Sequence, residues 1–368
     1  MSSSHSPSKR RRQLLAAPLL SAVPPWAAAA DTPAGNGAAA SARKVLRVPF
    51  YGAETTLDPV RSGDVYSATL TAHIFETLYA FDHLARPVKL VPLLADGMPE
   101  VSADFRVWTV RIKRGIYFAD DPAFKGQKRE LKAADVAYGF QRILDPANKS
   151  QFAEGLLEDG ILGLAELRHA ALQTRKPFDY DAPLPGLQLL DSHTLRFTLA
   201  QPRPRFLLTL AQSGKLVAQA RDAVDFYGAS ADEHPVGTGP FRLKQWVRSN
   251  RIVLERNTGY RERYYEAQPA ADDVQGQAIL AKMKGRRLPM VDEVVVTVIE
   301  ETQPLWLSFL NAEIDGLVAT AGPMPPEFVP QAVPGGQLAP HLAKRGIALH
   351  RVPRADSSYM YFNMNDPM

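Results

Sequence analysis

The sequence predicts a mixed α/β fold behind an N-terminal export signal, and three observations support this fold class. Short runs with alternating apolar and polar side chains indicate strands, as in Arg106–Ile112. Segments with apolar residues three or four positions apart indicate helices, as in Ala133–Leu144. These strands and helices follow one another in an irregular order, which favours a mixed α+β protein over a single regular doubly wound sheet.

The first 30 residues have the composition of a secretory signal peptide. Four cations at residues 9–12 precede a run of apolar and small residues that ends in an Ala-x-Ala type cleavage site. The run is too short and too rich in proline to span a membrane. Because Arg11 and Arg12 also fit a twin-arginine signal, both the general secretory route and the twin-arginine route remain open. We expect a signal peptide at residues 1–30 and a location in the periplasm.

Charge and cysteine content narrow the classes of partner and compartment. The chain has 43 Lys and Arg against 39 Asp and Glu, and four of the cations lie within residues 1–30. The remaining chain is therefore balanced, which excludes the basic surface that nucleic-acid binding requires. The absence of cysteine excludes disulfides and a lipid-modified cysteine after the cleavage site, so we expect a soluble protein. No other segment is long and apolar enough to span a membrane.

Local patterns place the expected elements in order along the chain. Residues 31–43 read as a flexible Ala/Gly linker. A helix capped by Asp64 precedes the others, and Glu154–Thr174 reads as one long helix. A turn at residues 191–193 joins two strands of a hairpin. The remaining expected elements are strands at Val45–Val48, Ile116–Phe118, Leu187–Leu190, Thr194–Leu199, Phe241–Trp246, Ile252–Arg256, Val294–Ile299 and Tyr359–Asn363, and helices at Val274–Lys284 and Leu305–Ala312.

Residues Pro235–Phe241, which we call the glycine loop, hold two glycines and two prolines in seven positions. Such a composition restricts the backbone to a narrow path. This path suits a loop that presents main-chain N–H and C=O groups to another molecule or segment. Taken alone, this segment is weak evidence for a function. Together with two distant segments, Thr56–Pro59 and Ile74–Tyr79, it becomes strong evidence.

These stretches, taken in order, resemble the extracellular solute-binding proteins of the oligopeptide/dipeptide/nickel-binding family (family 5), which serve ABC importers. No single stretch is diagnostic, and the ordered series carries the resemblance. The chain departs from the family at Lys132, where a Thr or Ser usually caps the following helix, at Ala312, and in an insertion at 266–289. The matching stretches are Thr56–Pro59, Ile74–Asp82, Trp108–Phe118, Ala133–Val136 with Arg142 and Asp145–Pro146, Thr194–Leu199 with Pro202, Val236–Phe241, Asn257 with Tyr260, and Glu313–Asp315.

The resemblance implies a two-lobed periplasmic binding protein-like fold, with the second lobe incomplete at Met368. We expect the chain to be a fragment or a truncated product. We expect a signal peptide at residues 1–30, a linker at 31–43 and a first-lobe core at 44–83 with 185–300. A subdomain associated with this lobe covers 84–184, and 301–368 is the start of the second lobe.

The resemblance also implies how the protein works. A ligand lies between two lobes that close around it, and main-chain groups pair with a peptide ligand whatever its side chains are. The expected partners are a peptide or other small solute and the membrane-embedded permease subunits of an ABC importer, with the protein a monomer and no cofactor or metal. The candidate contact residues are Glu54, Thr55, Thr56, Trp108, Thr238, Gly239, Tyr361 and Asn363.

For each of these residues a purely structural role competes with ligand contact; Trp108, for example, lies on an apolar alternating face. A nickel chelate, haem or another small solute is the alternative to a peptide, because one scaffold hosts all of these ligands. An exported hydrolase is the alternative from another class. It lacks support, because the sequence has no Gly-x-Ser-x-Gly elbow, no cysteine nucleophile and no His-Glu-x-x-His motif.

Overall fold

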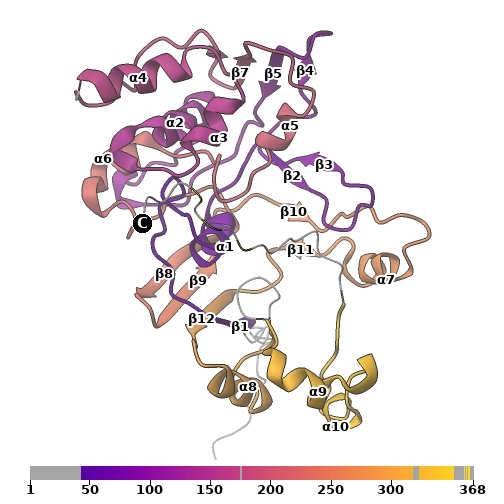
Figure 1. Cartoon of the computed structure of the whole chain (residues 1–368). Helices are drawn as coiled ribbons and strands as arrows, with labels where there is room; N and C mark the ends of the chain where they lie inside the picture. The colour runs from indigo at the N-terminus through magenta and orange to yellow at the C-terminus, as the bar shows by residue number, and fades with distance from the viewer. Residues whose placement is uncertain are drawn as a thin grey trace, which may run out of the picture. The chain divides into compact units, whose positions relative to one another are not determined.

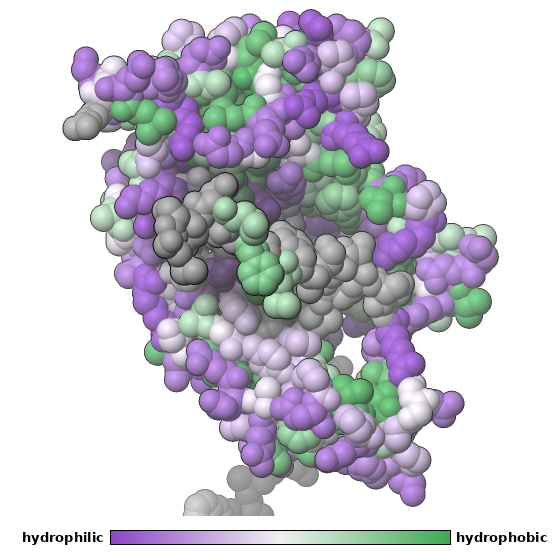
Figure 2. Space-filling view, in the orientation of Figure 1, coloured by the Kyte–Doolittle hydropathy of each residue, from purple (hydrophilic) through white to green (hydrophobic). Residues whose placement is uncertain are grey.

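The computed structural model describes residues 43–174, 176–317 and 323–351 and the single positions 360, 362 and 364. Its contacts divide the chain into residues 1–42 and 43–368, and only the second unit falls within the described residues. This unit mixes helices and strands, which confirms the predicted fold class (Figure 1). Most of the face drawn in Figure 2 is hydrophilic, with smaller hydrophobic groups between. The predicted signal peptide and the linker up to residue 42 lie outside the described residues.

The first sheet has the strand order β1-β12-β9-β8 and joins distant parts of the chain. Strand β1 pairs in parallel with β12, whereas β12–β9 and β9–β8 are antiparallel. Helix α1 (Val65–Ile74) packs against this sheet through Leu70 and Ile74, which join Phe50 and Ile252 in one buried cluster. The four strands are β1 (Val45–Phe50), β8 (Phe241–Val247), β9 (Arg251–Arg256) and β12 (Glu293–Val298).

The second sheet is antiparallel, with the order β4-β5-β7-β6. Its inner face carries Val110, Leu195 and Phe197, which pack with Phe140 of helix α2 (Ala133–Leu144) in the largest buried cluster. The strands are β4 (Glu100–Val101), β5 (Val107–Arg111), β6 (Leu187–Asp191) and β7 (Thr194–Thr198). Because β6 and β7 share a sheet with β5, the predicted boundary between residues 184 and 185 separates the subdomain at 84–184 from strands of its own sheet.

Helix α2 has the predicted bounds, and its start shows how the chain tolerates Lys132. The Lys132 side chain makes no capping hydrogen bond, as the sequence led us to expect. Instead, the Asp135 carboxylate accepts the Lys132 backbone N–H at 2.7 Å. This bond, from the N-cap N–H to the side chain of the third helical residue, is one of the two hydrogen bonds of a capping box.

The single helix predicted at Glu154–Thr174 is wrong, because the chain forms two helices there. Helix α3 (Ala153–Glu158) ends before Gly160, and helix α4 (Leu164–Thr174) begins after Gly163. Both glycines have positive φ angles, 69° and 88°, which a continuous right-handed helix does not allow. Periodicity alone did not reveal the break, since the apolar spacing continues across it.

The remaining elements are short. Residues Ile116–Phe118 do not form the predicted strand; only Tyr117 makes an isolated bridge, to Glu130. Helix α7 (Val274–Met283) confirms the helix predicted within the insertion, and strands β10 and β11 flank it. The others are β2 (Tyr79–Phe81), β3 (Leu90–Pro92), β10 (Arg263–Tyr264), β11 (Arg287–Leu288), α5 (Phe206–Thr209), α6 (Arg221–Tyr227), and short 3-10 turns at Pro122–Phe124, Pro146–Asn148, Gly228–Ser230, Pro326–Phe328 and Pro334–Gly336.

Residues 302–317 and 323–351 form a third, helical region with its own small core. It contains α8 (Thr302–Leu310), α9 (Val329–Ala332) and α10 (Pro340–Ala343). The Trp306 ring stacks on Phe328 with centroids 5.3 Å apart. The strand predicted at Tyr359–Asn363 lies outside the described stretches. Within the described residues, no helix has both the length and the apolar character that crossing a bilayer would require.

Candidate ligand-binding region

The loop between β1 and α1, residues 51–58, is the first candidate region, and we call it the first loop. The Asp64 carboxylate caps α1 by accepting the Ser67 N–H at 2.7 Å. The Ser67 hydroxyl in turn accepts the backbone N–H groups of Thr55 and Thr56 at 2.9 and 3.2 Å. The Thr55 hydroxyl donates to Asp64 at 2.6 Å. The start of α1 therefore holds this loop in place, with Thr55 exposed and Thr56 buried.

The hydrogen bonds at this helix start also set the charge state of Asp64. Partial burial would raise the pKa of its carboxyl, but the bonds from the Ser67 N–H and the Thr55 hydroxyl outweigh it and leave the pKa below its usual value. Asp64 is therefore ionised at neutral pH. A carboxylate at this position also interacts favourably with the helix dipole.

Glu54 is the buried acid of the first loop, with only 5% of its surface exposed. Its Oε1 accepts hydrogen bonds from the Trp246 indole N–H and from the Ser249 N–H, the latter at 3.3 Å. Its Oε2 has no hydrogen-bond partner among the described residues. A buried carboxylate oxygen without a donor is costly, so Oε2 is a position where an added donor would be favourable.

The first loop lies next to the helical region that begins with α8. Arg47, on β1, donates from its backbone N–H and its guanidinium to the Asp315 carboxylate at 2.7 and 2.8 Å. The Asp315 N–H returns a bond to the Arg47 carbonyl at 2.8 Å. The Tyr51 hydroxyl donates to the Pro323 carbonyl. The helical region is therefore joined to the edge of the first sheet through main-chain groups on both sides.

A cavity of about 610 Å³ lies within this helical region. Its lining is mostly apolar and includes Trp306, Phe309 and Met324, with Asp315 contributing a carboxylate. The side-chain hydrogen bond from Arg47 lowers the pKa of Asp315, which keeps that carboxylate ionised. The volume falls in the range of small-molecule pockets. This ligand-sized cavity therefore reaches the Arg47–Asp315 contact through Asp315.

The glycine loop uses several of its main-chain groups inside the protein, whereas its composition led us to expect that they face a ligand. The Gly239 N–H donates to the Ile74 carbonyl at 2.8 Å, and the Gly237 carbonyl accepts the Ala119 N–H at 2.9 Å. The Asn257 side chain donates to the Gly239 carbonyl at 2.9 Å. A Cβ on Gly237 or Gly239 would lie 2.0 or 2.5 Å from the Ile74 carbonyl oxygen. Both glycines therefore permit close packing on the end of α1.

Thr238 belongs to a buried polar cluster around Glu76, which we call the Glu76 cluster. Thr238 is 1% exposed, and its hydroxyl donates to Glu76 Oε2 at 3.0 Å. The Arg261 guanidinium binds both carboxylate oxygens, at 2.7 and 2.9 Å, and the Tyr260 hydroxyl donates to Oε1 at 3.0 Å. The cluster therefore satisfies every polar atom that Thr238 and Glu76 bring to it.

Trp108 lies within the core of the second sheet and is 3% exposed. Its indole N–H donates to the Phe105 carbonyl at 3.0 Å, and its ring meets Phe206 edge-on with centroids 5.7 Å apart. This placement leaves no group of Trp108 open to a ligand. Tyr361 and Asn363, the last two candidates, lie outside the described residues.

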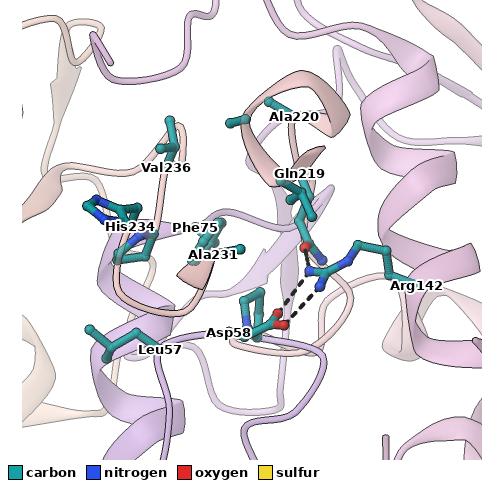
Figure 3. Close-up of a pocket in the computed structure, with 13 residues that line it drawn as sticks. Leu57, Asp58, Phe75, Arg142, Gln219, Ala220, Ala231, His234 and Val236 are labelled. Atoms are coloured by element: carbon teal, nitrogen blue, oxygen red, sulfur yellow. Dashed lines mark hydrogen bonds and ion pairs between the residues drawn. The ribbon is translucent and has the colours of Figure 1, made fainter. Parts of the chain in front are cut away.

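A second buried ion pair joins the first loop to α2 (Figure 3). Asp58 accepts two hydrogen bonds from the Arg142 guanidinium, both at 2.9 Å. Gln219 Oε1 accepts another bond from the same guanidinium, whereas Gln219 Nε2 has no partner within the described part of the chain. The adjoining cavity measures about 20 Å³, which is room for one water. The pair is therefore a structural anchor, and its cavity is too small for a solute.

Little in the described residues favours catalysis or metal binding. No group of three or more His, Asp or Glu side chains there could hold a metal ion. The buried carboxylates of Asp58 and Glu76 face arginines, and each arginine is held by two or more hydrogen bonds. These two buried ion pairs belong to the rigid frame of the fold. Sequence reasoning missed Arg261 and Gln219, because their partners are more than 75 positions away.

Known proteins share both the sequence pattern and the fold of this chain. The family model for bacterial extracellular solute-binding proteins, family 5 Middle, matches residues 89–368. The di/tripeptide-binding protein 2 of Pseudomonas aeruginosa is 30% identical over 240 residues, which are 62% of this chain and 40% of that protein. The periplasmic oligopeptide-binding protein OppA of Escherichia coli is 31% identical over 238 residues, which are 64% and 39% of the two chains.

Solved structures give the same result for the fold. A Helicobacter pylori DppA bound to the peptide STSA superposes with a TM-score of 0.54 at 25% identity, covering 74% of this chain and 46% of that one. A Haemophilus influenzae OppA bound to the peptide RPPGFSPFR gives 0.59 at 18% identity, covering 80% and 50%. The chain thus spans about two fifths of the curated relatives and about half of these structures. Because the family model matches most of its length, the chain belongs to the bacterial extracellular solute-binding proteins of family 5.

Proposed function

We propose that this chain is the part of a periplasmic receptor that captures a peptide and presents it to an ABC importer. The observation that carries the proposal is the family match over residues 89–368, together with relatives whose names specify peptide binding. Structures of two such proteins hold the peptides STSA and RPPGFSPFR. Peptide is therefore favoured over a nickel chelate, haem or another solute, which stay as alternatives on the same scaffold.

The first loop is the region of the chain that we assign to the ligand. Thr55 is exposed there, and Glu54 has a carboxylate oxygen without a donor. Peptide N–H groups are donors that suit such oxygens. Thr56 supports the loop from inside through the Ser67 hydroxyl. Ligand would lie between this loop and the second lobe, whose start we propose within residues 301–368.

The other candidate residues divide into two groups. Trp108, Thr238 and Gly239 are left out of the proposed site, because they are buried and the protein itself uses their polar groups. Tyr361 and Asn363 keep their place as candidates from the resemblance. We further propose that the protein carries out no covalent chemistry, works as a monomer, reaches the periplasm through its leader and docks on permease subunits.

Binding measurements on the full chain test this proposal. Isothermal titration calorimetry and thermal-shift assays would compare trialanine, a nonapeptide, reduced glutathione, haemin and a nickel–histidine chelate. Glutathione belongs in the panel because a protein named glutathione-binding protein GsiB, from Pectobacterium atrosepticum, is 26% identical over 206 residues. We expect one of the peptides to bind and to raise the melting temperature.

Two outcomes would replace the proposal. Binding of haemin or the nickel chelate alone would move the function to the alternative solutes. Turnover of an ester or peptide substrate, without stabilisation by any of these ligands, would favour the hydrolase.

A further inference from the structure

A second concave site lies in the subdomain built on the second sheet, away from the first loop. This groove has a volume of about 900 Å³ and lies between helix α2, the loop at residues 180–185 and strand β6. We call it the β6 groove. It shares no lining residue with the first loop, and its volume is in the range of ligand sites.

The floor of the β6 groove is one face of α2. Ala134, Ala137, Tyr138 and Gln141 line it, and their spacing places them on one helical stripe. The two alanines leave room above the helix that larger side chains would fill. Tyr138 closes the floor with an aromatic ring, and the Gln141 side chain donates to the Tyr180 carbonyl at 3.1 Å. The floor is therefore rigid and mostly apolar.

Strand β6, the opposite wall, is an edge of the second sheet with main-chain groups facing the open side. The hydrogen bond from Thr198 N–H to the Gly186 carbonyl, at 2.9 Å, sets the phase of its pairing with β7. The main-chain N–H and C=O groups of Gly186 and Gln188 therefore point to β7, and those of Leu187 and Leu189 point to the open edge. The Leu187 N–H donates to the Leu184 carbonyl. The pairing phase turns the N–H and C=O of Leu189 away from β7, and no described turn or loop residue donates to or accepts from them.

Leu189 is also unusual in its side chain. It stands opposite Leu195, which is completely buried on the inner face of the sheet, so both side chains point to that face. Yet Leu189 is 50% exposed, so the described residues cover this end of the inner face only in part. The exposed leucine and the free main-chain groups thus belong to one residue and face one groove.

The other edges of the two four-stranded sheets are protected, which sets β6 apart. Strand β4 has only two residues. The edge of β1 is occupied by Asp315, and β8 carries the charged residues Arg242 and Lys244. Short strands, covering contacts and charges are the usual defences of an edge against pairing with another strand. Strand β6 has five residues and no charged residue from Leu187 to Leu190, and its pairing with β7 is irregular between Leu189 and Asp191.

Charges at the rim of the β6 groove are already paired within the chain. Arg129 binds Asp135 at 2.6 Å, and Arg221 binds Asp181 at 2.6 Å. The Arg221 guanidinium also lies over the Tyr180 ring, 5.6 Å from its centre. A charged occupant would therefore gain no free counter-charge, whereas an uncharged one matches the apolar floor. The rim selects against charge and leaves the main-chain edge as the polar feature to be satisfied.

We propose that the β6 groove binds an extended, uncharged peptide segment that adds to β6 as a further strand. The segment pairs its main chain with the N–H and C=O of Leu189 and lays alternate apolar side chains against Leu189 and the α2 floor. The chemistry is that of an extended peptide with blocked charges. The site is separate from the first loop, so it does not depend on the proposed receptor function.

The test uses an end-blocked pentapeptide, acetyl-Thr-Leu-Thr-Leu-Thr-amide, and the same peptide with N-methylated backbone amides. Backbone amide NMR spectra of the full chain would be recorded during titration. We expect the first peptide to shift the resonances of residues 187–190 and the methylated peptide to leave them unchanged. Shifts confined to residues 51–58, or no shifts up to millimolar peptide, would overturn the proposal.

Two variants localise the effect. Leu189→Pro removes the outward N–H at a position where an edge strand tolerates proline, and Leu189→Lys adds an edge charge. Each should weaken binding about tenfold or more, which corresponds to about 1.4 kcal/mol. Val101→Lys makes the same change on β4 and should leave the affinity unchanged. Equal affinity in all four proteins, measured beside their thermal melting curves, would refute the role of β6.

Discussion

The glycine loop and the first loop both contain small and hydroxyl residues that suit ligand contact, yet of the two only the first loop has a buried side-chain oxygen without a partner among the described residues. In the glycine loop, the Thr238 hydroxyl and the Gly239 main chain bond to Glu76, Ile74 and Asn257. In the first loop, Glu54 Oε2 has no partner among the described residues, and Thr55 is exposed. Composition thus identifies a constrained loop, whereas the long-range partners of that loop decide whether it can serve a ligand.

The largest loss of stability should follow a change in the Glu76 cluster. Glu76→Ala removes the carboxylate that faces Arg261 and leaves that arginine buried without a counter-charge. We expect a loss of about 3–5 kcal/mol in the free energy of unfolding. Urea denaturation measures it. The matched control is Glu100→Ala, because Glu100 pairs with Arg111 on the surface, where both side chains are more than 60% exposed. That change should cost less than about 1 kcal/mol.

Equal losses in Glu76→Ala and Glu100→Ala would contradict the view that the Glu76 cluster is a buried anchor. The variant also bears on ligand binding. If the folded fraction of Glu76→Ala binds peptide as tightly as the original chain, the cluster supports the fold and has no part in the site.

The second effect tests why glycine is needed at position 237. Gly237→Ala would place a methyl group 2.0 Å from the Ile74 carbonyl oxygen, so the loop must move away from α1. We expect a loss of about 1–3 kcal/mol in stability, measured by thermal or urea unfolding. Gly155→Ala is the control, since its Cβ would meet nothing within 4 Å and it lies inside α3. That change should stabilise the protein by about 0.5–1 kcal/mol. A neutral Gly237→Ala variant would reopen the ligand-presenting interpretation of the loop.

Sequence reasoning succeeded where the deciding contacts are local. The bounds of α2 follow from its apolar spacing and from Asp145–Pro146. The cap of α1 follows from Asp64 and its position three residues before Ser67. Both features depend on neighbours within a few positions, so the sequence contains nearly all the information needed. The break between α3 and α4 was missed although Gly160 and Gly163 mark it locally, and the bridge between Ile161 and Leu199 ties the linking segment to a distant strand end.

The candidate site was harder to predict for the same reason. Thr238 and Glu76 are separated by 162 positions, and Glu76 and Arg261 by 185. Nothing in the local pattern around Thr238 shows that its hydroxyl is already used. Glu54 was predicted as a contact residue, but its bond to the Trp246 indole, across 192 positions, could not be read from its neighbours. Long-range pairing decides which polar groups stay free.

The third effect concerns the start of α1, which holds the first loop. Asp64→Ala removes the acceptor of the Ser67 N–H and should cost about 1 kcal/mol at pH 7. The pKa of Asp64 is lowered in the folded protein, so its contribution is present above the unfolded pKa of about 3.9 and is lost as pH falls through the folded value. Urea denaturation at several pH values should show the two proteins converging in acid. Asp64→Asn keeps the cap and should show little loss at pH 7; a constant Asp64→Ala deficit down to pH 2 would refute the assignment.

The smallest effect on stability should be the most informative for binding. Thr55→Val removes one hydroxyl, whose bond to Asp64 lies at an exposed position, and should change the free energy of unfolding by less than about 1 kcal/mol. If the first loop contacts peptide, the same change should weaken peptide binding in calorimetry several-fold. Thr69→Val, on the exposed side of α1 with its hydroxyl bonded to the Val65 carbonyl, is the matched control and should alter neither property beyond that limit. Equal affinities for Thr55→Val and Thr69→Val would remove Thr55 from the site. They would leave its role in holding the loop intact, because that role depends on the bond to Asp64 and not on a ligand.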